Sequence, residues 1–190
     1  MKNNMLSQSI PGGLLRLTNL ESIDLANNFL SQYLPGFNRS VPLRNLRRFS
    51  VFNNRLTGQN DFYEDGTFKN DTTPKLEELN LAKNYLPGRM LSDWGYLTGL
   101  KSLSLFENSF DSTIPVSFSA LKNLERLFLA NNKLTGSLEY KPNERFDEKR
   151  WPNLIVLSLS GNQLIGKFEP GVLNRTKFSA LEGLFIAYNK

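Results

Sequence analysis

The chain has 190 residues, a mass of 21.7 kDa and a formal net charge of +5 at pH 7, and it contains neither cysteine nor histidine. The missing side chains exclude thiol nucleophiles, Cys/His zinc sites, disulfides and Ser-His-Asp catalysis. The 23 basic and 18 acidic residues are interspersed, which argues against a nucleic-acid-binding surface. No apolar run reaches the roughly 18 residues of a membrane span, so we expect no direct membrane insertion by this segment.

An asparagine recurs along the chain, usually within the frame Leu-x-x-Leu-x-Leu-x-x-Asn-x-Leu. Subtracting neighbouring positions gives intervals of 24, 26, 30, 24, 24, 30 and 27 residues. The asparagines are Asn4, Asn28, Asn54, Asn84, Asn108, Asn132, Asn162 and Asn189. Self-similarity at a period of about 20–30 residues is typical of a solenoid of stacked coils. The sequence therefore predicts one repeat domain over residues 1–190, with about eight repeats.

Each frame contains a segment in which leucines alternate with other residues. Alternate residues of a strand point to opposite faces, so the leucines face inward and their neighbours face solvent. We predict the α/β fold class: a curved right-handed solenoid with a parallel β-sheet on the concave side and short 3-10 or irregular turns on the convex side. After a partial first repeat, the repeats are expected to start near Leu20, Leu46, Leu76, Leu100, Leu124, Leu154 and Leu181.

Two features of the frame lead to further expectations. The asparagine lies where the chain leaves the sheet, and its amide can both donate to and accept from backbone groups that burial would leave unpaired. The two 30-residue intervals predict inserts over 59–74 and 139–152, which we expect to project away from the sheet and to be the most mobile segments. We expect a hydrogen-bonded asparagine ladder formed by Asn28, Asn54, Asn84, Asn108, Asn132, Asn162 and Asn189.

The residues after the asparagine carry a family resemblance. Asn108–Pro115 and Asn4–Pro11 match the pattern Asn-x-Leu-x-Gly-x-Ile-Pro, with Ser112 and Gln8 in the glycine place. Three other repeats keep the Leu-x-Gly part, at Leu56–Gly58, Leu134–Gly136 and Leu164–Gly166. In these motifs the chain resembles plant-type leucine-rich-repeat proteins.

The resemblance implies a function. Members of that class are mostly ectodomains of receptor-like kinases and receptor-like proteins, or secreted inhibitors of cell-wall enzymes. They bind peptides, hormones or other proteins, commonly across the concave sheet. We therefore expect a non-catalytic, cofactor-free binding module in signalling, on the extracellular side of the plasma membrane or secreted. The chain departs from the class in lacking cysteine-paired caps and a kinase segment, and it begins and stops within a repeat. We expect it to be part of a longer receptor-like protein.

Exposed aromatic and charged side chains at the outward strand positions are the candidate contacts for a protein or peptide ligand, because aromatics and Arg often anchor interfaces. These are Arg48, Phe52, Glu78, Phe106, Arg126, Phe128, Phe185 and Tyr188. Two plainer interpretations remain open. The phenylalanines can pack along the sheet against neighbouring coils, and Arg48 beside Glu78 can be an ordinary cross-strand pair.

Other motifs are weaker. Asn38, Asn70 and Asn174 begin Asn-x-Ser/Thr triplets, which makes them possible glycosylation sites, but about three such triplets are expected by chance. Asp61, Glu64 and Asp65 form a local acidic group whose spacing does not match a calcium loop, so an enzyme that uses these acids is a remote alternative and no metal site is expected. A cytoplasmic scaffold or adaptor with the same fold is the main alternative function. The oligomeric state is left open.

Overall fold

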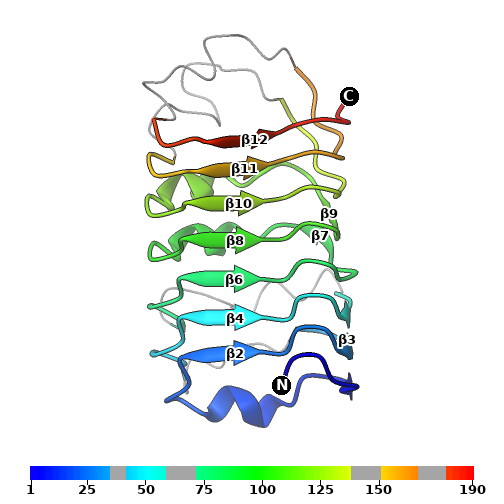
Figure 1. The fold of residues 1–190 in the computed structure, drawn as a ribbon, viewed down its shortest axis with the longest axis vertical. Coiled ribbons are helices and arrows are strands. Elements are labelled where there is room, and N and C mark those ends of the chain that lie inside the picture. The colour runs from blue at the N-terminus through cyan, green and yellow to red at the C-terminus, as the bar shows by residue number, and fades with distance from the viewer. Residues whose placement is uncertain (35–41, 59–71, 138–150, 167–178) are drawn as a thin grey trace.

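Seven short strands stack in one parallel sheet along the long axis of the molecule (Figure 1). The computed structural model describes residues 1–34, 42–58, 72–137, 151–166 and 179–190. The strands of this sheet are β2 (Ser22–Asp24), β4 (Arg48–Ser50), β6 (Glu78–Asn80), β8 (Ser102–Ser104), β10 (Arg126–Phe128), β11 (Val156–Ser158) and β12 (Gly183–Phe185). Their spatial order follows their order in the chain, so each coil stacks on the one before it.

The register of the sheet follows the leucine frame. The central residue of each strand is an apolar inward residue, and these residues pair in line from Ile23 and Phe49 through Leu79, Leu103 and Leu127. Those five side chains are at most 4% exposed. Since one strand cannot cover its own apolar side, the stack buries a continuous core that no single coil could form.

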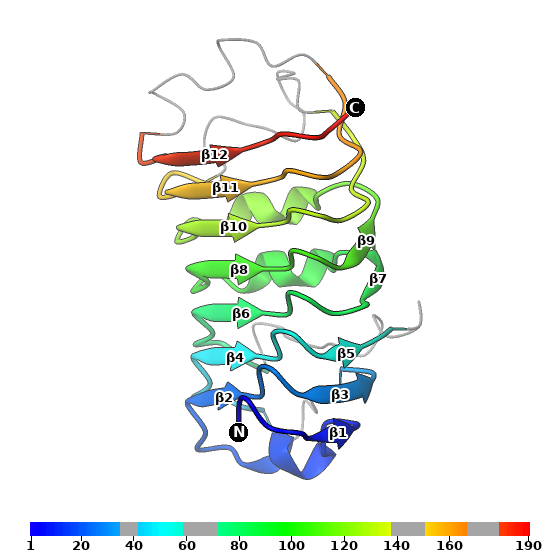
Figure 2. The ribbon, with the colours of Figure 1, turned by 45° about the vertical axis from the view of Figure 1, so that its right-hand side comes forward.

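A second set of short strands lies beside the sheet, after the turn that each asparagine makes (Figure 2). Strands β1 (Ser7–Gln8), β3 (Phe29–Gln32) and β5 (Arg55–Leu56) form one parallel ribbon. Strands β7 (Pro87–Arg89) and β9 (Ser109–Asp111) form another. The partial first repeat therefore enters the stack through β1 and contributes no strand to the seven-stranded sheet within the described residues.

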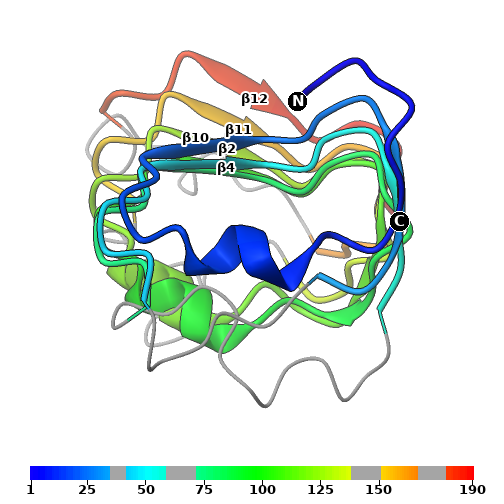
Figure 3. The same ribbon diagram turned by 90° about the horizontal axis from the view of Figure 1, so that it is seen from below.

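Within the described ranges, three 3-10 helices lie opposite the large sheet (Figure 3). They are η1 (Gly12–Arg16), η3 (Ser92–Tyr96) and η4 (Val116–Ala120). The described part of the chain contains no α-helix. The predicted solenoid, with a parallel sheet on one side and 3-10 turns on the other, is confirmed.

The predicted inserts 59–74 and 139–152 lie mostly outside the described residues. Their described ends are part of the core, because Thr72 and Thr73 are fully buried and Trp151 is 1% exposed. The division into repeats at the positions given above stays a prediction.

The two tryptophans, which are both buried on the 3-10 side, differ in their hydrogen bonding. Trp151 Nε1 donates to the Phe118 carbonyl oxygen at 2.7 Å. Trp94 packs edge-on against Phe110, with ring centroids 6.3 Å apart, and its Nε1 is buried without a hydrogen-bond partner in the described structure.

We expect Trp151→Phe to lower the free energy of unfolding by about 1–2 kcal/mol more than Trp94→Phe. Both changes remove the same volume, but only Trp151→Phe breaks a buried hydrogen bond, whereas Trp94→Phe removes an indole N–H that has no partner in the described structure. The Phe118 carbonyl keeps the hydrogen bond from the Leu121 N–H at 3.1 Å. Urea unfolding followed by far-UV circular dichroism measures the difference. Equal losses would contradict the assignment of the Trp151 hydrogen bond as the stabilising one.

Candidate functional site: the solvent-facing side of the sheet

The solvent-facing side of the seven-stranded sheet, called the sheet face below, presents two outward residues from each strand. The pairing aligns them in two rows across the coils. The first row is Ser22, Arg48, Glu78, Ser102, Arg126, Val156 and Gly183, and the second is Asp24, Ser50, Asn80, Ser104, Phe128, Ser158 and Phe185. The rows form an extended surface whose chemistry changes from coil to coil.

An inner row of asparagine side chains holds the coils at this spacing. In each of seven coils the Oδ1 atom accepts a hydrogen bond from a backbone N–H of the preceding coil, at 2.9–3.2 Å. The Nδ2 atom donates to carbonyls of its own coil and of the preceding one; for Asn84 these are Leu81 and Ala82, and Val51. The asparagines are Asn28, Asn54, Asn84, Asn108, Asn132, Asn162 and Asn189.

An aromatic and cationic cluster lies just past the strand ends. Phe52 and Phe106 belong to coils separated by one coil, and their ring centroids are 6.1 Å apart. They meet over Ala82, which is fully buried. Lys83 Nζ lies 5.9 Å from the Phe52 centroid and 6.0 Å from the Phe106 centroid, and 3.6 Å from a carboxylate oxygen of Glu107. The packing interpretation left open by the sequence thus applies to these two phenylalanines, although both remain partly exposed.

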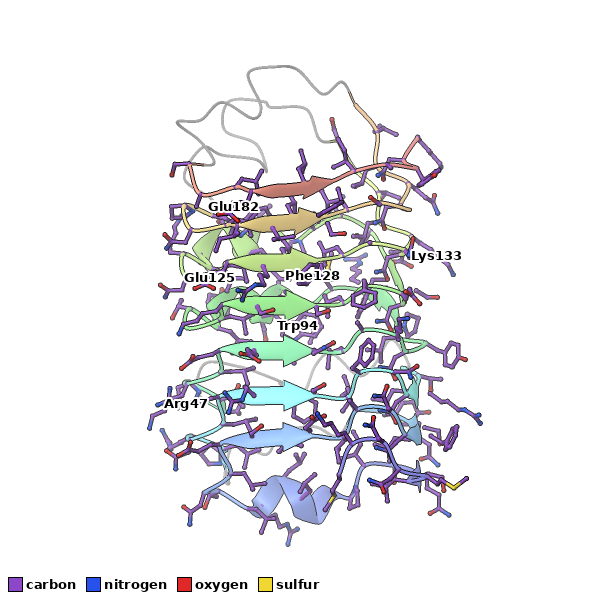
Figure 4. All side chains as sticks on the ribbon, viewed as in Figure 1. Arg47, Trp94, Glu125, Phe128, Lys133 and Glu182 are labelled. Atoms are coloured by element: carbon purple, nitrogen blue, oxygen red, sulfur yellow. The ribbon has the colours of Figure 1, made fainter. Side chains whose placement is uncertain are left out.

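A shallow hollow of about 280 Å³ opens on the sheet face beside this cluster. Small residues at β8 create it, since Ser102 and Ser104 stand between larger neighbours. It is lined by Glu78, Leu79, Asn80, Ser102, Ser104, Phe106 and Phe128. Phe128 projects from the end of β10 on the viewer's side of Figure 4. Three of the sequence-predicted contact residues, Glu78, Phe106 and Phe128, thus meet at one place.

The other predicted contact residues lie around or away from the hollow. Arg48 is in register with Glu78, but the described structure contains no ion pair between them. Arg126 lies 3.5 Å from Glu125. Phe185 and Tyr188 are 55% and 89% exposed on the last described coil, apart from the hollow.

A row of charges that the sequence reasoning missed lies where the strands begin, at the edge where Arg47, Glu125 and Glu182 are labelled in Figure 4. Glu77 pairs with Lys101 at 3.0 Å and with Arg47. Hydrogen bonds from Lys101 and then Arg47 lower the pKa of the Glu77 carboxyl below its ordinary value. The signal was readable, because the residue before each strand alternates in sign from Glu21 through Arg47, Glu77 and Lys101 to Glu125.

A larger hollow, of about 690 Å³, lies away from the sheet face, between the β7–β9 ribbon and the start of η3 and η4. Its lining includes Arg89 and Asp111, which are register partners of opposite charge. The rest of its lining comes from β7, the start of η3 and the loops between the strands and the 3-10 helices.

Several sequence expectations are not addressed by the described structure. The triplet asparagines Asn38, Asn70 and Asn174 and the acidic group Asp61, Glu64 and Asp65 all lie outside the described residues. Within the described ranges no group of three or more Asp or Glu side chains is arranged to hold a metal ion. None of the described helices has the length and apolarity needed to cross a bilayer.

Comparisons with known proteins agree with this architecture. The Leucine rich repeat family matches residues 74–134, and a second family of the same description matches residues 153–174. Receptor-like protein 18 of Arabidopsis thaliana is 25% identical over 185 residues, and receptor-like protein 13 of the same plant is 31% identical over 175 residues. These alignments cover 87% and 90% of the chain, which spans 21% and 15% of the two relatives.

Among solved structures, the leucine-rich-repeat ectodomain of the Arabidopsis receptor kinase HAESA, in complex with an N-terminally extended IDA peptide hormone ligand, superposes with a TM-score of 0.79. It is 32% identical, and the match covers 99% of this chain and 29% of the HAESA chain. The repeat frame, the stacked parallel sheet and these similarities together show that the chain is a plant-type leucine-rich-repeat protein resembling the ectodomains of receptor-like proteins and receptor kinases.

Proposed function

We propose that the chain is a non-catalytic recognition module that binds an extended peptide or protein segment across its sheet face, as part of a cell-surface receptor-like protein in signalling. The proposed location is the extracellular side of the plasma membrane, or secretion. The proposed contacts are Arg48, Phe52, Glu78, Phe106, Arg126, Phe128, Phe185 and Tyr188.

The observation that carries the proposal is the hollow between β6, β8 and β10. Phe106 and Phe128 form aromatic walls there, and Ser102 and Ser104 leave space between them. Aromatic walls around a small depression are where interface anchors are usually found. The similarity to the HAESA ectodomain, which is solved with a peptide hormone ligand, supports a peptide as the ligand class.

A rigid surface of this kind favours binding over catalysis. The strands are fixed in register by the backbone and by the asparagine row, so a ligand meets a preformed surface and little ordering of the protein opposes binding. The contact side chains belong to neighbouring coils, so a ligand that touches several of them must run along the stack. An extended segment meets that requirement.

A peptide-display selection tests the proposal. A library of random linear 12-residue peptides is selected on the purified chain, and the enriched peptides are compared on two double variants. Phe106→Ser/Phe128→Ser alters the sheet face, and Tyr96→Ser/Val116→Ser removes two side chains that are 60% and 57% exposed on the 3-10 side. We expect the first variant to weaken the selected peptides at least tenfold, and the second to leave them unchanged.

Both variants must unfold at the same urea midpoint for the comparison to hold. Peptides that bind the Phe106→Ser/Phe128→Ser variant as well as the original chain would overturn the sheet face as the binding surface. A selection that yields only peptides sensitive to the 3-10-side variant would move the binding surface to that side.

A further inference from the structure

We infer that the hollow on the sheet face is a subsite for an arginine side chain of the bound segment. This inference rests on the proposed function, because it gives the chemistry of one residue of the ligand. The side chains that carry it are the two aromatic walls, Phe106 and Phe128, the carboxylate of Glu78, and the hydroxyls of Ser102 and Ser104.

The molecule already contains a cation in a matching environment one coil away. Lys83 Nζ lies about equally far from the rings of Phe52 and Phe106, with a Glu107 carboxylate oxygen at 3.6 Å. A cation within about 6 Å of a ring centroid is attracted by the negative face of the ring. Two phenylalanines on nearby coils and one carboxylate therefore surround a positive charge on this surface.

The hollow repeats that combination without a cation of its own. Phe106 is shared between the two places, Phe128 takes the part of the second ring, and Glu78 supplies the carboxylate. The hydroxyls of Ser102 and Ser104 line the floor, and neither has a hydrogen-bond partner among the described residues. Both hydroxyls can accept hydrogen bonds from a donor-rich side chain.

Among the described residues, Glu78 forms no ion pair with the cations around the hollow, and this includes Arg48, its register partner on β4. Arg126 lies against Glu125, and Lys83 lies against Glu107. Two further cations, Lys101 and Arg47, both form ion pairs with Glu77. Glu78 is exposed and takes part in no ion pair within the described ranges. The Glu78 carboxylate is therefore available to a cation of the bound segment.

Arginine fits this set of groups better than lysine or a neutral residue does. Its flat guanidinium stacks on aromatic faces and carries five N–H donors in a fixed fork, which suits two ring walls, a carboxylate and two hydroxyls. A lysine ammonium is more strongly hydrated and lacks the planar face. A neutral isostere keeps the shape but offers no charge to Glu78.

A titration with blocked amino acids tests the subsite without a known ligand. The ¹⁵N-labelled full chain is titrated with Nα-acetylarginine amide and, separately, with the neutral isostere Nα-acetylcitrulline amide, and amide chemical shifts are followed. We expect the arginine compound to shift the Ser102–Ser104 and Phe128 signals in a saturable way, and to bind at least about fivefold more tightly than the citrulline compound.

Two charge-matched variants locate the effect. Glu78→Gln is expected to abolish the preference for arginine over citrulline. Glu21→Gln, which removes another exposed acid just before β2, two coils from Glu78, is expected to leave the preference unchanged. Equal binding of the two compounds, an unchanged preference in Glu78→Gln, no saturable shift at all, or shifts centred on Glu107 or Glu125 would each overturn the subsite.

The outcome is separable from the test of the proposed function. Peptides selected on the sheet face without any dependence on Glu78 or on arginine would reject the subsite and keep peptide binding. If the arginine compound binds in the hollow but no selected peptide is weakened by Phe106→Ser/Phe128→Ser, peptide binding on the sheet face would be rejected and the subsite would be supported.

Discussion

Replacement of Asn84 by alanine is expected to lower the free energy of unfolding by about 3–5 kcal/mol. Asn84 is 6% exposed, and its Oδ1 atom accepts the backbone N–H of Leu56 at 3.0 Å. Its Nδ2 atom donates to the carbonyls of Val51, Leu81 and Ala82 at 3.0–3.2 Å. Alanine removes all four hydrogen bonds and leaves a void where the amide was.

The four backbone groups that hydrogen-bond to the Asn84 side chain are not equally affected by its removal. The Val51 and Leu81 carbonyls keep hydrogen bonds from the neighbouring asparagines, Asn54 and Asn108. The Ala82 carbonyl keeps one from the Asn53 N–H at 3.0 Å. The Leu56 N–H is left with no acceptor in a fully buried residue, and an unpaired buried donor costs about 1–3 kcal/mol by itself. The orphaned N–H and the lost amide bonds together account for the expected size.

The loss also breaks a link between coils, which predicts a change in cooperativity. Asn84 joins its own coil to the preceding one, and stability in a solenoid is roughly the sum of coil and interface terms. Urea unfolding followed by circular dichroism should therefore show a lower midpoint together with a smaller slope. A matched control is Asn123→Ala, which removes one exposed hydrogen bond to the Thr98 carbonyl and is expected to cost less than about 1 kcal/mol. Similar losses in the two variants would refute the assignment of the asparagine row as the main link between coils.

The repeat frame predicted the fold because its physical meaning is local. Alternating leucines set which side of each strand is buried, and the sheet register follows from stacking those leucines in line, as Leu79, Leu103 and Leu127 show. The described residues contain no α-helix, and two of their short 3-10 segments, η1 and η4, begin directly after a proline, Pro11 and Pro115. The sequence pattern predicts the fold here because every coil repeats the same arrangement of inward leucines and a turn at the asparagine.

Backbone conformation was less accessible from the sequence. The residue before each asparagine of the row has a positive φ, between 52° and 68°, in coil after coil. Asparagine suits that conformation at Asn27 and Asn53, but Lys83 and Glu107 adopt it as well. Lys83 and Glu107 adopt this unfavourable backbone conformation because the stacked coils impose it. Residue propensities alone would not predict either residue at such a position. A positive φ also explains the glycine position of the family pattern, because Ser112, which occupies that position here, has a φ of 67°.

The candidate site was only partly predictable. Outward positions follow from strand alternation, so Glu78, Phe106 and Phe128 were found as candidates. Their meeting in one hollow depends on the small residues between them and on the packing of the Phe106 ring against Phe52. Neither Phe185 nor Tyr188 joins that group, since both lie on the last described coil. Side-chain direction across neighbouring coils is a property of three-dimensional packing, which a one-dimensional pattern does not encode.

The second large effect is expected at Gly95, where η3 passes against η4. A Cβ added to Gly95 would lie 2.6 Å from Ser117 Cβ and closer still to the Ser117 carbonyl group, which is backbone and cannot rotate away. Ser117 is also held in place, because its Oγ donates to the Ser92 carbonyl oxygen at 2.6 Å. Gly95→Ala must therefore push two adjacent coils apart at their 3-10 helices.

We expect Gly95→Ala to lower the free energy of unfolding by about 2–3 kcal/mol, in the upper range for overpacking by one methyl group. The matched control is Gly13→Ala in η1, where an added Cβ meets no atom within 4 Å and the unfolded chain loses entropy, so stability should stay the same or rise by up to about 1 kcal/mol. Thermal and urea unfolding of the two variants measure the contrast. If Gly95→Ala were as stable as Gly13→Ala, η3 and η4 would have to lie farther apart than the structure places them, because no side-chain rearrangement relieves a contact with backbone.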